Sequence, residues 1–197
     1  MSVGRRSVLR AAGFTALAAG VGGGLAACTG TGAAGSTPVN GDPGSSASLR
    51  VIPVAERKAA PVLTGPLVDG APFDLGAWRG SPVVVNVWGS WCGPCNDEQP
   101  DLVAAAKPLA PRGVKFLGLD QETSRANAQA HQRTYGVTYP SLADPDGTQL
   151  LRFRGLIPPA SVPTTVVLDT EHRVAAFKIA RITKATLLAM VDEVTGR

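Results

Sequence analysis

The chain has 197 residues, with 19 lysines and arginines against 15 aspartates and glutamates, which gives a formal net charge of +4. Three of the arginines lie in the first 27 residues, so the remainder carries a net charge of only +1. This balance gives no sign of a nucleic-acid partner, and the roughly 137 residues after position 60 suffice for one domain with a single core.

The first 27 residues have the pattern of an export signal. Arg5, Arg6 and Arg10 precede an uncharged run from residue 11 to residue 27 that consists mostly of Ala, Gly and Leu. The stretch Arg5–Leu9 resembles a twin-arginine signal, with Sec export as the alternative. A membrane-spanning helix is disfavoured because the run is short and rich in glycine. We therefore expect residues 1–27 to be a Tat-like lipoprotein signal peptide.

Residues 25–28 read Leu-Ala-Ala-Cys and resemble a bacterial lipobox, in which cleavage before Cys28 leaves a lipid-modified cysteine at the new N-terminus. An ordinary small-residue cleavage site is the alternative. A lipidated Cys28 predicts an exported protein anchored to the outer face of the cytoplasmic membrane. It also leaves only Cys92 and Cys95, so no further cysteine pair remains for a structural disulfide.

Residues 28–60 are predicted to be the lipidated cysteine followed by a flexible linker. This stretch is rich in Gly, Ser, Thr, Ala and Pro and cannot bury enough apolar surface to offset the entropy of ordering it. A linker of this kind would tether a soluble domain near the membrane. Residues 61–197 are predicted to form that domain.

Inside residues 61–197 the pattern alternates strands and helices. A short hairpin is expected first, with Leu67-Val68 and Phe73–Leu75 as its arms around Asp69-Gly70. The β-branched run Pro82–Trp88 is typical of a strand buried on both faces. The later elements are predicted as a helix over Gly93–Lys107, a strand over Val114–Leu119, a helix over Ser124–Tyr135, strands over Thr164–Leu168 and Val174–Phe177, and a helix over Lys184–Val194. This order predicts a three-layer α/β fold.

Residues 91–95 read Trp-Cys-Gly-Pro-Cys and stand between the buried strand and the helix that follows it. Two thiols at this spacing can close into one reversible disulfide. The unpaired N–H groups and the positive end of the helix dipole favour a thiolate at the first position, which makes Cys92 the expected nucleophile. Pro94 suits the first helical turn, where its missing N–H costs nothing.

The stretch Gly80–Pro100 resembles the TlpA/ResA-like group of membrane-tethered thioredoxins. Shared features are the two cysteines, the tryptophan before them, Glu98, Pro100 and a downstream Val-Pro-Thr. The resemblance extends from about Leu63 to Val194. It implies the thioredoxin fold, a central mixed β-sheet flanked by helices, here with an N-terminal β-hairpin extension.

The resemblance also implies a substrate-binding loop. Val162, Pro163 and Thr164 occupy the place of the family's cis-proline loop, which lies beside the disulfide and offers backbone groups to an extended substrate chain. Pro163 would be the cis residue, with an ordinary trans proline as the alternative. Trp91, next to the disulfide, is assigned to the same substrate-binding surface.

Glu98 is expected to assist the two thiols. It stands three residues after Cys95, about one helical turn along, and in ResA-like proteins a glutamate there tunes thiol protonation. A partly buried carboxylate can raise a thiol pKa by repulsion or relay a proton. Asn86 stands where thioredoxin has a buried aspartate, and because Asn cannot bind a proton this role moves to Glu98. The alternative is a solvated helix residue.

The implied activity is that of an extracytoplasmic protein thiol-disulfide oxidoreductase, most simply a reductase of the cytochrome c maturation type. Cys92 would attack a substrate disulfide and Cys95 would then release the reduced substrate. Implied partners are proteins with cysteine pairs, such as apocytochrome c, and a transmembrane thiol carrier resembling CcdA. No cofactor, metal or nucleic acid is expected, and the protein is expected to be a monomer.

Three other functions are compatible with the same residues. The chemistry can run in reverse, as an exported oxidase that forms disulfides. A metal-binding lipoprotein would use Cys92 and Cys95 as soft ligands, but His131 and His172 show no ligand spacing with them. A peroxidase would need a Thr-x-x-Cys pattern that the sequence lacks.

Three further features receive simpler predictions. His172 is expected to be a solvated turn residue, and Arg152 and Arg154 are expected to lie on the surface. The insert Leu156–Ser161 precedes the predicted cis-proline closely enough to influence the choice of substrate.

Overall fold

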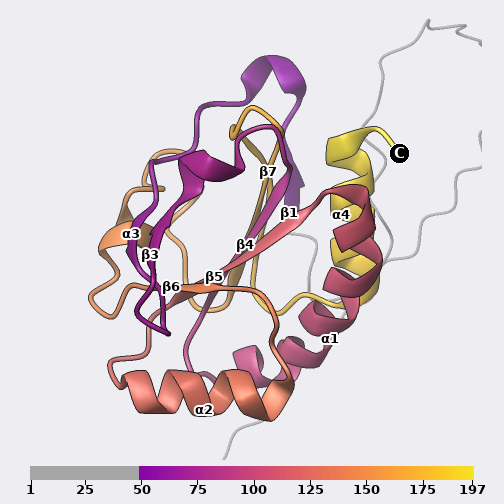
Figure 1. The fold of residues 1–197 in the computed structure, drawn as a ribbon. Coiled ribbons are helices and arrows are strands. Elements are labelled where there is room, and N and C mark those ends of the chain that lie inside the picture. The colour runs from indigo at the N-terminus through magenta and orange to yellow at the C-terminus, as the bar shows by residue number, and fades with distance from the viewer. Residues whose placement is uncertain (1–48) are drawn as a thin grey trace, which may run out of the picture. The chain divides into compact units, whose positions relative to one another are not determined.

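The computed structural model describes residues 49–197 (Figure 1). The predicted signal peptide, Cys28 and the linker up to residue 48 lie outside the described residues. Within residues 49–197 no helix is both long and apolar enough to cross a membrane.

The described chain is built on a six-stranded mixed sheet with the order β1-β8-β7-β4-β5-β6. Its strands are β1 (Leu49–Val51), β4 (Val83–Trp88), β5 (Lys115–Asp120), β6 (Ser141–Ala143), β7 (Thr164–Leu168) and β8 (Val174–Ile179). Strands β4, β5 and β6 are parallel, whereas β7 is antiparallel to β4, β8 to β7 and β1 to β8. The carboxyl ends of β4 and β5 therefore meet at one edge of the sheet.

Helices cover this sheet, and α1 and α4 lie side by side on one face (Figure 1). The helices are α1 (Gly93–Leu109), α2 (Arg125–Tyr135), α3 (Thr148–Leu151) and α4 (Lys184–Thr195), with short 3-10 turns η2 (Val54–Glu56), η3 (Leu75–Trp78) and η4 (Ala110–Arg112). Alternate side chains of β4 point to opposite faces of the sheet. Val83, Val85 and Val87 join one core cluster, and Val84 joins a second cluster with residues of α1 and α4. This is the thioredoxin fold that the resemblance implied.

The hairpin extension is present, with its arms at slightly different residues from those predicted. Strands β2 (Thr64–Pro66) and β3 (Pro72–Asp74) pair antiparallel, and the Leu67 N–H donates to the Ala71 carbonyl at the turn. The sequence patterns did not predict two short elements, β6 and α3. Each is only three or four residues long, which is too short for a hydrophobic period to show.

The folded domain includes strand β1 and so begins earlier than the predicted start at residue 61. Strand β1 lies in the stretch predicted to be flexible linker, yet it pairs with β8 from Leu49 to Val51. Leu49 and Val51 pack against the core cluster of α1 and α4, and Ile52 is buried. A few apolar residues thus suffice to add an edge strand to a sheet that is already formed.

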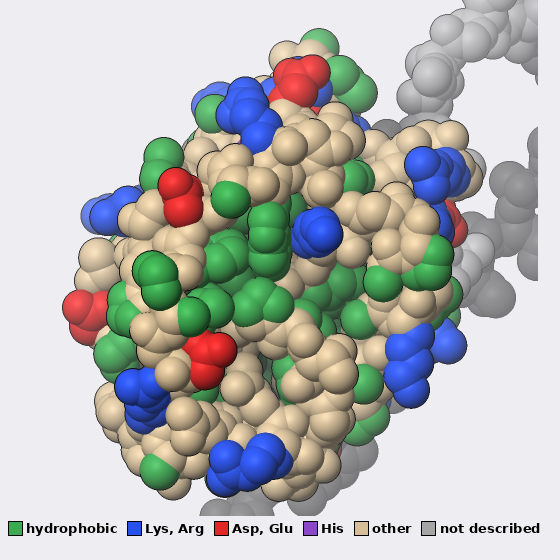
Figure 2. Space-filling view, viewed as in Figure 1, with side chains coloured by type: hydrophobic (Ala, Val, Ile, Leu, Met, Phe, Trp, Pro, Cys, Tyr) green, Lys and Arg blue, Asp and Glu red, His purple; other side chains and the backbone are tan. Residues whose placement is uncertain are grey.

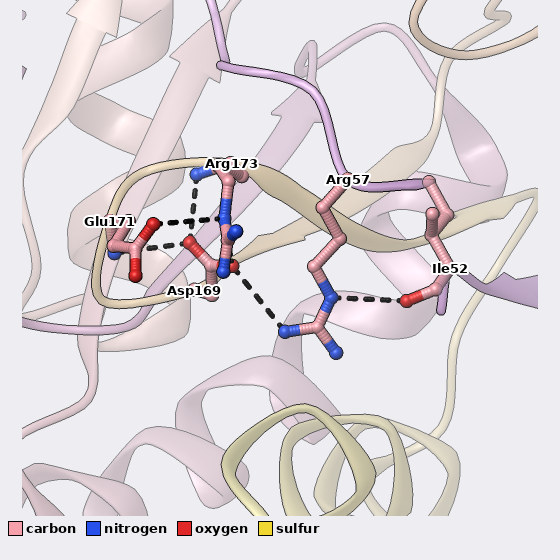
Figure 3. A network of polar contacts seen from close by, with 5 residues as sticks. All are labelled: Ile52, Arg57, Asp169, Glu171 and Arg173. Carbon is pink, nitrogen blue, oxygen red and sulfur yellow. Dashed lines mark hydrogen bonds and ion pairs between the residues drawn. The ribbon is translucent and has the colours of Figure 1, made fainter. Parts of the chain in front are cut away.

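Asp169 fastens the segment after β1 to the turn between β7 and β8 (Figure 3). Its Oδ1 accepts the N–H groups of Glu171 and Arg173, and its Oδ2 accepts from Arg173 Nε at 2.9 Å. Arg57 reaches the same Oδ2 at 3.4 Å and donates from Nε to the Ile52 carbonyl at 3.0 Å. One carboxylate therefore joins two segments that are far apart in the sequence.

His172 in this turn is buried, so the prediction of a solvated residue is wrong. It does occupy a turn position, with φ of 55°. Its carbonyl accepts the N–H of Ala60, and Ala59 bridges to Arg173, so the segment before β2 lies against the turn. Packing by that distant segment, which local sequence does not reveal, removes His172 from solvent. Arg152 and Arg154 are exposed, as predicted.

Candidate active site

The two cysteines lie at the junction of β4 and α1. All six residues of β4 are buried, and the chain turns at residues 89–91 before α1 begins. Cys92 is the N-cap of α1, and its Sγ accepts the N–H of Cys95 at 3.2 Å. A disulfide joins Cys92 to Cys95. Because the helix N-terminus favours negative charge, a reduced Cys92 is placed to be a thiolate.

The two sulfur-bearing residues differ in accessibility. Cys92 retains 5% of its surface exposed, whereas Cys95 has none. Both pack in one cluster with Val68, Trp88 and Ala128. Cys92 is therefore the more accessible of the two cysteines.

Trp91 is 62% exposed and lies beside the turn that precedes Cys92. Its indole ring covers Gly89 so closely that a Cβ there would come within 2.7 Å of the ring. The same turn is held by Asn96, which donates to the Ser90 carbonyl, and by a hydrogen bond from Ser90 Oγ to Glu122. Trp91 thus presents a large apolar surface next to the accessible cysteine.

The loop before β7 reaches the disulfide from another part of the chain. The peptide bond between Val162 and Pro163 is cis, as predicted. Val162 packs against the cysteine cluster. The Pro163 carbonyl accepts from Ala180 N–H and Thr164 Oγ1 donates to Ser161, so both are engaged within the chain. Within residues 49–197 the backbone of Val162 makes no such bond, which leaves it available to an extended peptide.

Glu98 lies one helical turn after Cys95 and is fully buried. Its Oε1 accepts from Asn86 Nδ2 at 2.8 Å, and its Oε2 accepts from the Ile182 N–H at 2.8 Å. Burial raises the pKa of Glu98 to about 7, against the lowering effect of these two hydrogen bonds. The carboxyl group can therefore gain or lose a proton near neutral pH.

Asp120 is a second buried acid that the sequence reasoning missed. It ends β5 directly opposite Trp88 of β4, and Trp88 packs against both cysteines. Burial, together with repulsion from Glu122 and Asp144, raises the pKa of Asp120 to about 7. The clue available in the sequence was an acid at the carboxyl end of a parallel strand, the edge where sites of α/β folds gather.

His131 also lies close to the cysteine cluster, on α2. Its ring stacks on Trp88 with centroids 4.4 Å apart, and its Nε2 lies 3.4 Å from Gln99 Oε1. Burial lowers the pKa of His131, so the ring is neutral at physiological pH. Among the described residues no group of three or more His, Cys, Asp or Glu is placed to hold a metal ion.

These residues together can carry out dithiol-disulfide exchange with a polypeptide. An accessible sulfur at a helix N-terminus supplies the nucleophile, a buried sulfur behind it can close the ring, and two acids that titrate near neutral pH can exchange protons. The Val162 backbone and the Trp91 ring provide surfaces for an extended chain.

Comparison with known proteins agrees with this chemistry. Residues 57–177 match the model of the AhpC/TSA family. The chain is 26% identical over 134 residues to the "Thiol-disulfide oxidoreductase ResA" of Bacillus subtilis, covering 68% of this chain and 73% of the relative. It is 29% identical over 140 residues to the "Thiol:disulfide interchange protein HelX" of Rhodobacter capsulatus, covering 71% and 76%.

Solved structures agree as well. A DsbF homologue from Corynebacterium diphtheriae is 29% identical and superposes with a TM-score of 0.69, covering 81% of this chain and 99% of that one. A secreted thiol-disulfide isomerase from Corynebacterium glutamicum is 27% identical with a TM-score of 0.71, covering 82% and 99%.

Proposed function

The chain belongs to the AhpC/TSA family, as a ResA-like protein thiol-disulfide oxidoreductase, and from that premise we propose that it reduces disulfide bonds in exported proteins. The observation on which the proposal rests is the asymmetry of the cysteine pair. Cys92 caps α1 and keeps 5% of its surface exposed, next to Val162 and Trp91, whereas Cys95 is fully buried. This supports Cys92 as the attacking group and Cys95 as the resolving group.

The proposed reaction proceeds in two exchanges. The Cys92 thiolate attacks one sulfur of the client disulfide, forms a mixed disulfide and expels the other client sulfur as a thiolate. The client lies extended against Val162, with Thr164 and Pro163 holding that loop in place. Cys95 then loses its proton and attacks Cys92, which releases the second client thiol. The client gains two electrons, and the enzyme ends with the Cys92–Cys95 disulfide.

Glu98 is proposed to handle the Cys95 proton. It follows Cys95 by one turn of α1, it is buried with it, and its pKa near 7 allows it to accept a proton during the second exchange. The Ile182 and Asn86 hydrogen bonds hold the carboxyl group in one orientation.

The buried acid that follows Cys95 by one helical turn favours the reductase direction. An ionised carboxylate raises the free energy of a neighbouring thiolate, and a less stable thiolate makes the dithiol a better electron donor. Glu98, one turn after Cys95 on α1 and buried like it, is placed to have this effect. A strongly oxidising pair would instead need a thiolate that its surroundings stabilise.

The cellular setting is proposed from the sequence and from the relatives. The isomerase from Corynebacterium glutamicum is named a secreted protein, which fits the export signal predicted in residues 1–27. We propose that lipidated Cys28 anchors the monomer to the outer face of the membrane, with a tether that ends before Leu49. An exported reductase must be recharged, which suggests a membrane thiol carrier resembling CcdA, and apocytochrome c is the proposed client by resemblance to ResA.

Trapping of mixed disulfides tests the assigned roles. In the full chain, Cys95→Ser is expected to accumulate mixed disulfides with exported clients, because the resolving thiol is gone. Cys92→Ser is expected to trap none, since the buried Cys95 is not accessible to a client. Non-reducing electrophoresis with and without dithiothreitol measures both. Equal trapping by the two variants, or trapping only by Cys92→Ser, would contradict the roles.

A further inference from the structure

A large apolar groove lies away from the cysteines, along the first half of β5. Its volume is about 700 Å³. Hydrophobic side chains gather over β5 and β6 in the middle of the face shown in Figure 2. The lining of this groove, here called the β5 groove, consists of Trp78, Val103, Ala106, Lys107, Ala110, Val114, Lys115, Phe116, Tyr135, Gly136, Thr138, Tyr139 and Pro140.

The backbone at the floor of the β5 groove is an open sheet edge. Strand β6 pairs with β5 only from Gly118 onward, so the first half of β5 pairs with β4 alone. The Lys115 N–H donates toward β4, to Pro82, whereas the Gly118 N–H donates the other way, to Pro140. Because the groups of a parallel strand alternate in direction, the N–H and C=O of Phe116 point away from β4, into the open edge.

Aromatic rings surround this edge. Both tyrosines of the chain line the groove, together with Trp78 and Phe116. The ring of Tyr139 packs 5.4 Å from that of Phe116, and its hydroxyl is fixed by Gln99 Nε2 at 2.6 Å. Rigid aromatic surfaces beside backbone groups that β6 does not pair with are suited to hold an apolar side chain of an added strand.

The charge of the lining is of one sign. Lys107 and Lys115 are both exposed, and no aspartate or glutamate belongs to the lining. Two copies of the chain paired through this edge would bring these lysines together, which disfavours a second copy as the occupant. A segment that bears acidic residues would complement them.

We propose that the β5 groove binds an extended segment of a partner protein, which adds as a strand to β5 at Phe116. Its apolar side chain would lie among the four aromatic rings, and its acidic residues would face Lys107 and Lys115. The lining comes from the second half of α1 and the first half of β5, whereas Cys92 precedes α1. A partner could thus be held while Cys92 reacts with a client.

Binding of a defined peptide to the oxidised full chain tests this site. The probe is a fluorescein-labelled capped peptide with the sequence Glu-Val-Phe-Val-Glu, measured by anisotropy. We expect Lys107→Glu with Lys115→Glu to weaken its binding about tenfold, since two charge pairs are reversed. The matched control, Lys58→Glu with Lys184→Glu, changes two exposed lysines outside the groove and should bind like the unaltered chain.

Amide hydrogen exchange locates the bound peptide. Strand addition should slow exchange of the Phe116 N–H and leave Val162 unchanged. The proposal is overturned if the peptide does not bind at about 1 mM, if the groove reversal and its control bind equally, or if protection appears at Val162. Sedimentation that shows a dimer broken by the groove reversal would also overturn it, because the occupant would then be a second copy. Trapping by Cys95→Ser is independent of all these results.

Discussion

Glu98 is a buried acid whose carboxylate accepts two hydrogen bonds. It follows Cys95 by one turn of α1, and the proposed reaction requires the Cys95 thiol to lose its proton. Neither donor carries a full charge, since one is the amide of Asn86 and the other is the Ile182 N–H. They therefore offset only part of the cost of burying a carboxylate. The result is a pKa of about 7, which keeps both protonation states accessible at physiological pH.

The pKa of Glu98 predicts how stability depends on pH. The folded-state pKa of about 7 exceeds the ordinary value of 4.5, so the folded protein binds this proton more tightly than the unfolded one. The corresponding stability is fully present below pH 4.5 and is lost as pH rises through 7. This titration should lower the free energy of unfolding by about 3 kcal/mol as the pH rises, and we expect that decrease to be absent in Glu98→Gln. Urea denaturation of the oxidised protein at pH 5 and pH 8 measures it.

Two further variants serve as controls. Glu193→Gln, at an exposed position of α4, should keep the pH profile of the unaltered chain. Asp120→Asn should remove a further part of the pH-dependent decrease in the free energy of unfolding, because the pKa of Asp120 is also raised to about 7. Parallel pH profiles for Glu98→Gln and the unaltered chain would show that Glu98 titrates normally.

At the scale of elements, one buried ion pair joins the segment that follows strand β1 to the β7–β8 turn. The side chains of Arg57 and Asp169 are each only 7% exposed. Burial raises the pKa of Asp169, but hydrogen bonds from Arg173 and Arg57 and the charge of Arg173 lower it by more, so the net direction is downward. Asp169 is thus ionised in the folded state, and its stabilising effect is lost only as pH falls through that lowered pKa.

Removing Asp169 should therefore loosen the edge of the sheet. Asp169→Ala leaves the buried Arg57 without its carboxylate partner and removes two backbone caps from the β7–β8 turn, at an expected cost of about 3 kcal/mol. Urea denaturation measures this cost, and amide hydrogen exchange should show faster exchange in β1 than in β4.

The pair between Arg50 and Glu56 gives a matched comparison. It flanks the same strand, but both side chains are 59% exposed, so Glu56→Gln should cost less than about 1 kcal/mol. If Asp169→Ala costs no more than Glu56→Gln, the pair does not hold β1 in place.

At the scale of the whole molecule, the cysteine pair and the β5 groove lie at different parts of the same sheet. The carboxyl ends of β4 and β5 meet beside the cysteine pair, with Asp120 and Trp88 in register. The Asp169 network fastens the turn between β7 and β8, and the β5 groove opens along a half-paired strand. A redox centre of this design leaves other surfaces available for partners.

Much of the centre of this architecture was predictable from sequence. Val83–Trp88 is a long β-branched run, and Cys92 with Pro94 marks a helix start, so β4 and α1 follow from local signals. The Ser124 cap of α2 was likewise predictable, and its side chain accepts the Asn127 N–H. The Val162–Pro163 loop came from a motif resemblance.

The remainder depends on contacts between distant segments. Strand β1 exists because β8 offers an edge, and His172 is buried because residues near Ala60 cover it. Asp120 lies opposite Trp88 because β4 and β5 pair in this register, and His131 reaches Trp88 by stacking on its ring. Periodicity along the chain contains no information on such pairings. Of these residues only Asp120 had a clue in the sequence, as an acid at the carboxyl end of a parallel strand.

The reduction potential of the Cys92–Cys95 pair in the full chain tests the central proposal most directly. The protein is equilibrated with dithiothreitol and glutathione buffers, and its thiols are quantified by alkylation. A reductase whose thiolates are disfavoured by Glu98 should have a potential near the thioredoxin value of roughly −270 mV. A potential near roughly −120 mV would show an exported oxidase instead, and a pair that forms no disulfide at any poise would contradict the exchange chemistry altogether.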